Sequence, residues 1–279
     1  MCGRFVLTAT PEEVRALFRY AEQPNFPPRF NIAPTQPIAI VTGPGAAPKF
    51  LLARWGFLPG WVADPKAFSL IINARAETAA TKPSFRAAMR HRRCLVPASG
   101  FYEWRRTPAG KQPFFIRPRH GGLTAFAGLW ETWSSKDGSE IDTACILTVP
   151  ANRAIAAIHD RMPAVVGPQH HAAWIDTMHV DVAEAMRLIA PVADDYFEAV
   201  PVSERVNKVV NDDERLLLPL TEPLLPPAAP PHETAAEARE RTQAPDPAGP
   251  AGVPKPARRA APRKKAAGGK AAGGQLDLL

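Results

Sequence analysis

Cys2 carries the most distinctive chemistry available to this chain. It follows the initiator methionine, and its small side chain predicts that Met1 is removed and that cysteine becomes the amino-terminal residue. The residue would then present a thiol, with a pKa of about 8.5, beside an α-amino group with a pKa of about 7.7 to 8.0. An aldehyde could form an imine with the amine and then a thiazolidine ring with the thiol. This predicts a carbonyl trap or an N-terminal nucleophile; the alternative is a small buried hydrophobic residue.

The residues around Cys2 suit ligand binding. Gly3 permits close backbone approach, and Arg4 offers a fixed positive charge that would lower the thiol pKa or bind a phosphate. The other cysteines, Cys94 and Cys145, lack C-x-x-C spacing, so we expect core positions for them and neither a disulfide framework nor a zinc site. No metal or organic cofactor is implied. No apolar signal segment follows the start, which predicts a cytoplasmic protein with no membrane segment.

Two titratable residues are candidates for proton transfer. Glu103 lies between Tyr102 and Trp104 at the end of an apolar strand, where desolvation would raise the carboxyl pKa and suit it to acid–base catalysis. The alternative for Glu103 is a strand residue that faces solvent. His159 ends a predicted helix, where the helix dipole favours its cationic form. The alternative for His159 is a capping residue paired with Asp160.

Two further segments carry polar and aromatic residues suited to a phosphate-containing ligand. Asn73 and Arg75 share one face if the strand continues through both, so that an amide would orient the ligand and a guanidinium would clamp a phosphate. The alternative for Arg75 is an ion pair with Glu77. Trp61 follows Gly60 in a predicted loop and could stack on a nucleic-acid base. The alternative for Trp61 is a tryptophan that covers the core.

Composition divides the 279 residues near Leu220. No Phe, Trp or Tyr occurs after Phe197, and 11 of the 32 prolines follow residue 222, so residues 221–279 cannot bury enough apolar surface to fold and are predicted to form a disordered tail. The tail's last 25 residues carry seven Lys and Arg side chains against one Asp, or +6, and the total net charge of +7 minus 6 leaves +1 for residues 1–254. We therefore expect the folded part to be close to neutral overall, and a local arginine patch would have to supply its affinity for nucleic acid.

The pattern of residues 1–220 predicts a single α+β domain with a largely antiparallel, barrel-like β core and peripheral helices. A capped helix begins after Thr10, where Pro11 and two glutamates fill the first turn. Runs rich in β-branched and aromatic residues predict strands at 37–42, 49–55, 69–73, 93–97, 113–117, 123–130 and 143–149. Further helices are predicted at 84–91, 150–158, 168–177 and 181–190.

Several motifs, taken in order, resemble one family. The segments are MCGRF, NIAP, WGF with PGW, INARAET, CLVPASGFYEW and HDRMP, and the resemblance covers residues 2–218. Their order is similar to that of the SOS-response-associated peptidase (SRAP) family, whose bacterial and eukaryotic members shield abasic sites in single-stranded DNA. The resemblance implies a role in DNA damage and the SOS response.

The resemblance also implies roles for individual residues. Cys2 would form the thiazolidine with the ring-opened C1′ aldehyde of an abasic site, and Asn73 would orient the amine and the sugar. Glu103 would shuttle protons during imine and ring formation, and His159 would assist sugar ring opening and the reverse reaction. The implied DNA contacts are phosphates at Arg4, Arg75 and Arg161, and a stacking aromatic at Trp61.

One position departs from the family pattern. Some members have a second tryptophan after the position of Trp61, and this chain has Val62 there. The aromatic wedge against DNA would then be weaker or completed by Phe68.

Two other activities stay open on the sequence. The same Cys2, Glu103 and His159 could serve a peptidase that acts on the Met1–Cys2 bond, on the protein itself or on other proteins. The chain could also be a non-covalent single-stranded-DNA-binding module with no chemistry.

The end of the tail carries a separate motif. Its sequence resembles the Q-L-[SD]-L-F pentapeptide by which bacterial proteins dock into the replicative sliding clamp, with Leu in place of Phe at the last position; the residues are Gln275, Leu276, Asp277, Leu278 and Leu279. Apolar anchors on an extended segment are what peptide-in-groove recognition uses. We therefore expect a monomer that contacts single-stranded DNA and, through its tail, the sliding clamp.

Overall fold

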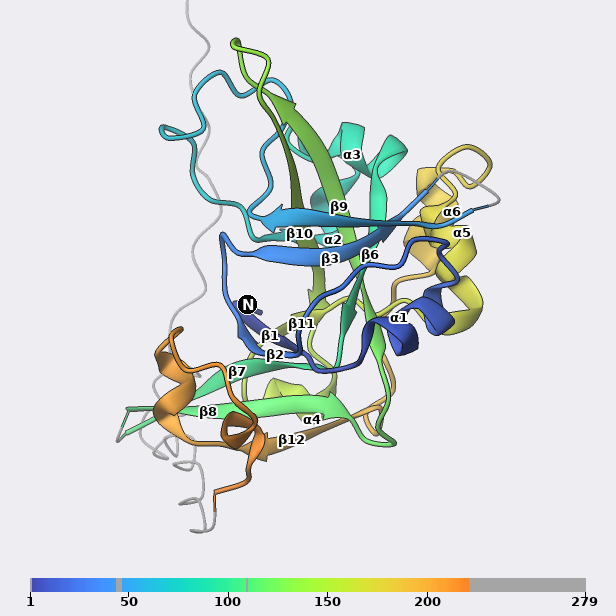
Figure 1. Cartoon of the computed structure of the whole chain (residues 1–279). Helices are drawn as coiled ribbons and strands as arrows, with labels where there is room; N and C mark the ends of the chain where they lie inside the picture. Colours follow the sequence, from blue (N-terminus) through green and yellow to red (C-terminus); the bar gives the residue numbers. More distant parts are fainter. Residues whose placement is uncertain (1, 44–46, 109, 221–279) are drawn as a thin grey trace, which may run out of the picture. The chain divides into compact units, whose positions relative to one another are not determined.

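Two β-sheets form the framework of the computed structural model, which describes residues 2–43, 47–108 and 110–220 (Figure 1). In the described residues the first sheet has five strands, in the order β12 (Phe197–Pro201), β8 (Gly110–Pro118), β7 (Gly100–Thr107), β1 (Arg4–Leu7), β2 (Arg29–Ile32). All four pairings between these neighbours are antiparallel. The chain's amino-terminal strand is thus hydrogen-bonded on both edges.

The second sheet curls into a barrel. Its strands follow the order β11 (Arg161–Pro163), β10 (Glu140–Pro150), β4 (Lys49–Trp55), β3 (Pro37–Thr42), β6 (Arg93–Ala98), β9 (Thr124–Ser134), and β9 also pairs with β10, which closes the ring. β5 (Asn73–Arg75) is added along β10. Apart from the parallel pairings of β10 with β4 and β5, the ladders are antiparallel. The predicted α+β fold with a largely antiparallel, barrel-like core is confirmed.

One predicted strand is displaced along the chain. The strand expected at 69–73 is β5, which begins at Asn73, and before it only Ile71 forms an isolated bridge, with Phe57. The apolar run that suggested the strand therefore lies mostly in the segment that leads into β5. Because the strand continues through Asn73 and Arg75, the condition for placing these two residues on one face is met.

The helices are short and lie outside the sheets (Figure 1). α1 (Pro11–Phe18) begins at the predicted cap, where the Thr10 hydroxyl accepts from the Glu13 backbone N–H and the Glu13 carboxylate accepts from the Thr10 N–H. The predicted helices at 84–91, 150–158, 168–177 and 181–190 contain shorter ones: α3 (Arg86–His91), α4 (Arg153–Ala156), α5 (His171–Ile175) and α6 (Val182–Arg187). A further turn, α2 (Ala76–Ala79), follows β5. In the described part no helix is long and apolar enough to cross a membrane.

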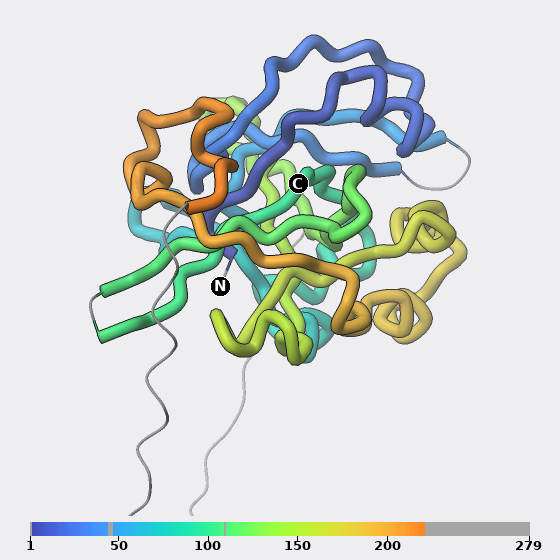
Figure 2. Tube along the Cα trace, turned by 90° about the horizontal axis from the view of Figure 1, so that it is seen from below, coloured from blue at the N-terminus to red at the C-terminus, as the bar shows by residue number. Residues whose placement is uncertain are grey.

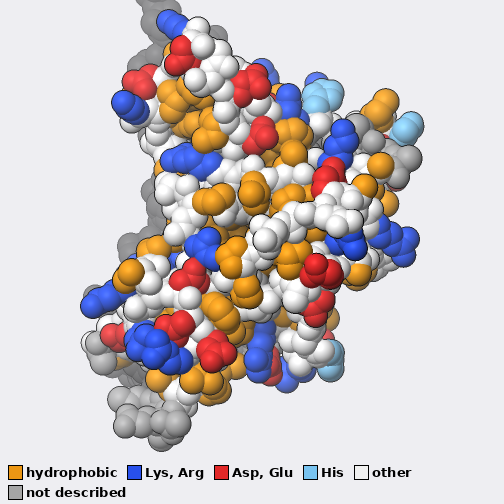
Figure 3. Space-filling model, in the orientation of Figure 1, with side chains coloured by type: hydrophobic (Ala, Val, Ile, Leu, Met, Phe, Trp, Pro, Cys, Tyr) orange, Lys and Arg blue, Asp and Glu red, His pale blue; other side chains and the backbone are white. Residues whose placement is uncertain are grey.

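β1 joins two hydrophobic clusters. Phe5 belongs to the main core, where its ring lies edge-on to Trp55 at 5.2 Å between centroids. Its neighbour Val6 points to the other face of the strand and packs in a smaller cluster with Tyr102 and Val206. Because both faces are buried, the strand is fixed between the main core on one side and the cluster that contains Val206 on the other. The surface of the face drawn in Figure 3 mixes basic, acidic and apolar side chains.

Arg93 is a buried cation that stabilises the barrel. Its side chain is 1% exposed, and its nitrogens donate to the backbone carbonyls of Met89, Trp174, Asp176 and Val180 at 2.6–3.0 Å. These carbonyls lie on or just after α3 and α5, so one guanidinium satisfies the ends of two helices. Burial lowers the pKa of Arg93. The side chain therefore ties both helices to β6.

We expect Arg93→Met to lower the free energy of unfolding by about 3 to 5 kcal/mol, because four buried carbonyls would lose their donor. Urea unfolding followed by circular dichroism measures the change. Arg90→Met, at an exposed position of α3, is the matched control and should change stability by no more than about 0.5 kcal/mol. A loss below about 1 kcal/mol for Arg93→Met would show that water or neighbouring groups replace the guanidinium.

Candidate active site

Cys2 lies where the two sheets meet, and Asn73 holds its backbone. β5 pairs in parallel with β10, with Asn73 opposite Ile146, and this brings the Asn73 side chain to the amino-terminal strand. The Asn73 Nδ2 donates to the Cys2 carbonyl at 2.8 Å, and Cys2 is fully buried. The Oδ1 of Asn73 is buried and has no hydrogen-bond partner in the described residues. The structure thus brings together two predicted site residues and leaves an acceptor beside them.

The environment of the thiol differs from the expectation. The Cys2 Sγ lies 3.7 Å from the Arg4 carbonyl, while burial, together with the negative charge of Glu103, raises the pKa of the thiol. The expectation that Arg4 lowers this pKa is wrong. The Arg4 guanidinium is directed to other partners, so its charge does not act on the sulfur. The thiol is therefore protonated at neutral pH and needs a base when it reacts.

Glu103 is a buried acid on β7. Its side chain is 2% exposed, which excludes the solvent-facing alternative. Burial raises the pKa of Glu103, and the nearby His159 opposes this shift. Both side chains line a cleft of about 480 Å³. Glu103 is thus within electrostatic reach of Cys2 and His159, as the predicted site requires.

His159 is held by its own loop, between α4 and β11. The Arg161 backbone N–H donates to His159 Nδ1 at 3.0 Å, and the Asp160 carboxylate lies 2.9 Å from the same nitrogen. The first contact suits a neutral ring and the second a protonated one, so the loop accommodates both states of the side chain. Both contacts use Nδ1. The predicted pairing with Asp160 is therefore formed, and His159 also lines the cleft.

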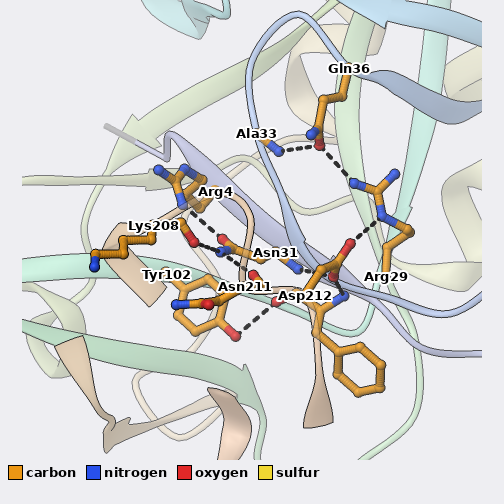
Figure 4. Close-up of polar contacts among 10 residues, drawn as sticks. Arg4, Arg29, Asn31, Ala33, Gln36, Tyr102, Lys208, Asn211 and Asp212 are labelled. Atoms are coloured by element: carbon orange, nitrogen blue, oxygen red, sulfur yellow. Dashed lines mark hydrogen bonds and ion pairs between the residues drawn. The ribbon is translucent and has the colours of Figure 1, made fainter. Parts of the chain in front are cut away.

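Arg4 belongs to a hydrogen-bond network that links both ends of the described chain (Figure 4). Its Nη1 donates to the Asn31 Oδ1 and to the Val206 carbonyl, each at 2.8 Å. The Asn31 Nδ2 in turn donates to the carbonyls of Val206, Lys208 and Asn211 at 2.8–3.2 Å. Because Asn31 is fully buried, this amide fixes both the Arg4 guanidinium and the segment that follows residue 206.

Asp212 completes the network shown in Figure 4. Its carboxylate accepts from the Asn31 backbone N–H at 2.9 Å and from the Arg29 Nε at 2.6 Å. Sequence reasoning singled out the NIAP segment without giving Asn31 a role. The signal was an asparagine inside an apolar strand, which must satisfy its amide when buried.

Arg75 and Arg161 flank the same strand residue. Thr148 of β10 lies opposite Arg75 of β5, and it also accepts a hydrogen bond from Arg161 through its carbonyl. Arg75 is exposed, as a phosphate-binding residue must be. Arg161 is instead engaged with Glu77, with 2.8 Å between its Nη2 and the Glu77 Oε2. The ion pair that was the alternative for Arg75 is therefore formed by Arg161.

Glu77 limits what Arg161 can bind. The hydrogen bond from Arg161 lowers the pKa of Glu77, so this carboxylate is charged at neutral pH. A phosphate that reaches Arg161 has to compete with it. The two arginines thus differ in their surroundings. Arg75 is open to an external anion, whereas Arg161 is already paired with the Glu77 carboxylate.

Trp61 is 63% exposed in the segment between β4 and β5, which excludes the core-covering alternative. Its ring lies edge-on to Phe68 at 5.8 Å. Trp133 anchors this segment by donating to the Val62 carbonyl at 2.6 Å, and Val62 itself is buried. The segment that carries the exposed Trp61 ring is therefore held in place, as a stacking surface requires.

The two remaining cysteines are structural. Cys94 lies in β6 and Cys145 in β10, both are fully buried, and neither forms a disulfide in the described residues. Burial raises the pKa of both thiols. The predicted core positions are confirmed.

Comparison with known proteins identifies the family of this chain. Residues 1–209 match the family described as SOS response associated peptidase (SRAP). The chain belongs to the SRAP family. The match agrees with the resemblance found over residues 2–218.

Relatives of this SRAP chain span nearly its whole folded part. It is 35% identical over 221 residues to the abasic site processing protein YoqW of Bacillus subtilis, covering 78% of this chain and 99% of that one. It is 31% identical to the abasic site processing protein YedK of Escherichia coli, covering 79% and 100%. A crystal structure of a Bacteroides thetaiotaomicron protein aligns with a TM-score of 0.72 and 25% identity, covering 78% and 100%.

Sequence reasoning missed part of the SRAP cleft. Besides Arg4, Glu103 and His159, the cleft is lined by Trp104, Arg106, Lys111 and Asn207. Trp104 donates to the Asn207 Oδ1 at 2.8 Å. The strand predicted at 113–117 begins at Gly110, and β7 (Gly100–Thr107) is not among the predicted strands. The outer halves of both strands are polar, so they gave no periodic apolar signal.

The raised pKa of Glu103 gives a stability prediction with a definite sign. A carboxyl whose pKa is raised by folding destabilises the native state as the pH rises from the unfolded value through the folded one. Glu103→Gln cannot ionise, so its melting temperature should exceed that of the wild type at pH 8, and the difference should vanish below about pH 4. Calorimetry at both pH values tests this, with the exposed Glu204→Gln as control. A lower melting temperature at pH 8 would contradict it.

Proposed function

We propose that this protein shields abasic sites in single-stranded DNA by forming a covalent thiazolidine through Cys2. The observation that carries the proposal is the 2.8 Å hydrogen bond from Asn73 to the Cys2 carbonyl, since it fixes the reactive residue near Glu103 and His159. The relatives are named as abasic site processing proteins. We further propose that the protein acts as a monomer in the cytoplasm, on the nucleoid.

The first step is the opening of the abasic sugar. The abasic sugar exists mainly as a cyclic hemiacetal at C1′, and this form has no aldehyde for the amine to attack. His159 lines the cleft, with its Nδ1 held by the Arg161 backbone N–H. It moves a proton from the C1′ hydroxyl toward the ring oxygen, so that the C1′–O bond breaks and the aldehyde forms.

The second step joins the amine of Cys2 to C1′. The nitrogen adds to the aldehyde and gives a carbinolamine, and its hydroxyl leaves as water with a proton from Glu103. The raised pKa of Glu103 favours the protonated carboxyl that this step uses. The nitrogen then releases its remaining proton to solvent, so the product is a neutral imine and the Glu103 carboxylate is left charged.

The third step closes the ring. The Cys2 sulfur bonds to C1′ while its proton passes through the Glu103 carboxylate to the ring nitrogen. Because burial raises the thiol pKa, this base is required. One water is lost in total. The amine is consumed by the ring, so the β-elimination that an imine promotes is suppressed and the strand stays intact.

The reaction needs a free amine on Cys2, so the proposal includes release of Met1. The same Glu103 and His159 support an autopeptidase step at the Met1–Cys2 bond, as the family's name suggests. The proposal is limited to this one bond of the protein itself.

Intact-protein mass tests the covalent step. We expect wild-type protein lacking Met1 to gain the mass of an abasic oligonucleotide minus one water, and Cys2→Ser to form no such stable adduct. Glu103→Gln should form the adduct more slowly, by a factor of up to about 10², because one proton-transfer group is lost. DNA without an abasic site is the control. A stable adduct with Cys2→Ser, or none with the wild type, would overturn the proposal.

We also propose that the tail docks on the replicative sliding clamp. The motif, residues 275–279, lies outside the described residues, and the proposal depends on the sequence alone.

A tail peptide of residues 265–279 should bind the purified clamp, and Leu276→Ala with Leu278→Ala should abolish the binding, because the apolar anchors are removed. Fluorescence anisotropy measures this binding. Ala267→Ser, a small change upstream of the motif, is the control and should leave the affinity unchanged. Absence of binding by the wild-type peptide would reject the proposal.

A further inference from the structure

The hairpin of β7 and β8 projects beyond the body of the first sheet. Figure 2 shows its two strands extending past the neighbouring strands. The inner part of β7 is buried, from Gly100 to Glu103, whereas the outer part from Trp104 to Thr107 is half-buried or exposed. Within this outer half Trp104 packs against the smaller hydrophobic cluster, whereas Arg106 is exposed.

Two cations face each other on this outer half. Arg106 of β7 lies directly opposite Lys111 of β8, and both line the cleft that contains Glu103 and His159. Like charges directly opposite each other in an antiparallel pair are destabilising. In the described residues neither side chain forms an ion pair.

Two other arginines of the same sheet are neutralised by an acid. Arg117, at the other end of β8, pairs with Glu198 on β12 at 2.6 Å, and Arg29 of β2 pairs with Asp212 at 2.6 Å. Among the described residues, the sheet thus supplies acids for these cations away from the cleft and none for the two at its rim. An anion from outside the protein would remove the repulsion between Arg106 and Lys111.

We infer that the outer β7–β8 hairpin, through Arg106 and Lys111, is a phosphate-binding arm that holds the DNA backbone on one side of the abasic site. This rests on the proposed function. Arg106 is three residues along the strand from Glu103, which is roughly 10 Å. Phosphates of a stacked strand are about 3.4 Å apart along its axis, so the arm reaches a phosphate about three nucleotides from the abasic sugar.

The arm belongs to the sheet that carries Arg4, and it differs from the two other arginines expected to contact DNA. Arg75 lies on β5 and Arg161 on β11, both in the barrel, whereas the hairpin belongs to the other sheet. A single projecting hairpin extends from Cys2 in one direction, so it serves one flank of the lesion only.

The test uses a single-stranded 15-mer with a central tetrahydrofuran, an abasic analogue without an aldehyde, so that binding is measured apart from the covalent step. The double variant Arg106→Gln, Lys111→Gln should bind about tenfold more weakly, and the slope of log K against log salt should fall by about 1.4, because two contacts are lost. The charge-matched control is Arg90→Gln, Arg187→Gln, on exposed positions of α3 and α6, and should bind as the wild type does. Circular dichroism verifies that both variants fold.

Two truncated oligonucleotides test whether the arm binds DNA on only one side of the abasic site. Each keeps only two nucleotides on one flank of the analogue, one on the 5′ side and the other on the 3′ side. The double variant should match the wild type on one of them and keep its full loss on the other. Equal losses of affinity on both truncated oligonucleotides would overturn the proposed arm. So would a double variant that keeps the wild-type affinity and salt slope on every oligonucleotide. Failure of the proposed function would show separately, as a wild type that binds the analogue and forms no adduct with a true abasic site.

Discussion

The double pairing of β1 is the constraint on which the site depends. The strand is hydrogen-bonded to β2 on one edge and to β7 on the other, and Phe5 and Val6 bury its two faces in different clusters. An amino terminus usually frays, since nothing ties it down. Here Cys2 is two residues from a strand that cannot shift without disturbing both sheets, so its backbone is already ordered before any ligand arrives. Pre-organisation of this kind removes an ordering cost from the reaction.

Burial of the reactive groups has two opposite consequences. It raises the pKa of both the Cys2 thiol and the Glu103 carboxyl, which disfavours their charged forms. A protonated thiol is a poor nucleophile toward adventitious electrophiles, so the resting residue is protected. A protonated Glu103, in contrast, is ready to act as an acid. The same low polarity therefore raises the pKa of the thiol and of the carboxyl that lies within its electrostatic reach.

Local patterns predicted the elements whose signals are local. The capping box at Thr10 and the apolar runs of β3 and β4 gave helix and strands at the observed positions. β1, β2 and β12 were not predicted, because strands of four or five residues carry too few alternations to be recognised. The site residues Cys2, Asn73, Glu103 and His159 were named from motifs, but their contacts depend on pairings between distant segments. The alternative that paired Arg75 with Glu77 was wrong: Glu77 lies close in sequence to Arg75, but it pairs with Arg161, which the β10–β11 ladder brings near.

The hydrogen-bond network of Arg4 links the last part of the described chain to the amino-terminal strand β1. The family match stops at residue 209, yet Asp212 accepts from the backbone of Asn31, and Asn31 holds Arg4. Leu216 is buried in the cluster that contains Val6, and the Leu220 N–H donates to the Pro201 carbonyl at 3.0 Å. A chain cut at residue 209 would therefore lose the carboxylate that orders Asn31 and one side of the packing around β1. Because these contacts meet next to Cys2, the residues beyond the match are part of what positions the reactive terminus.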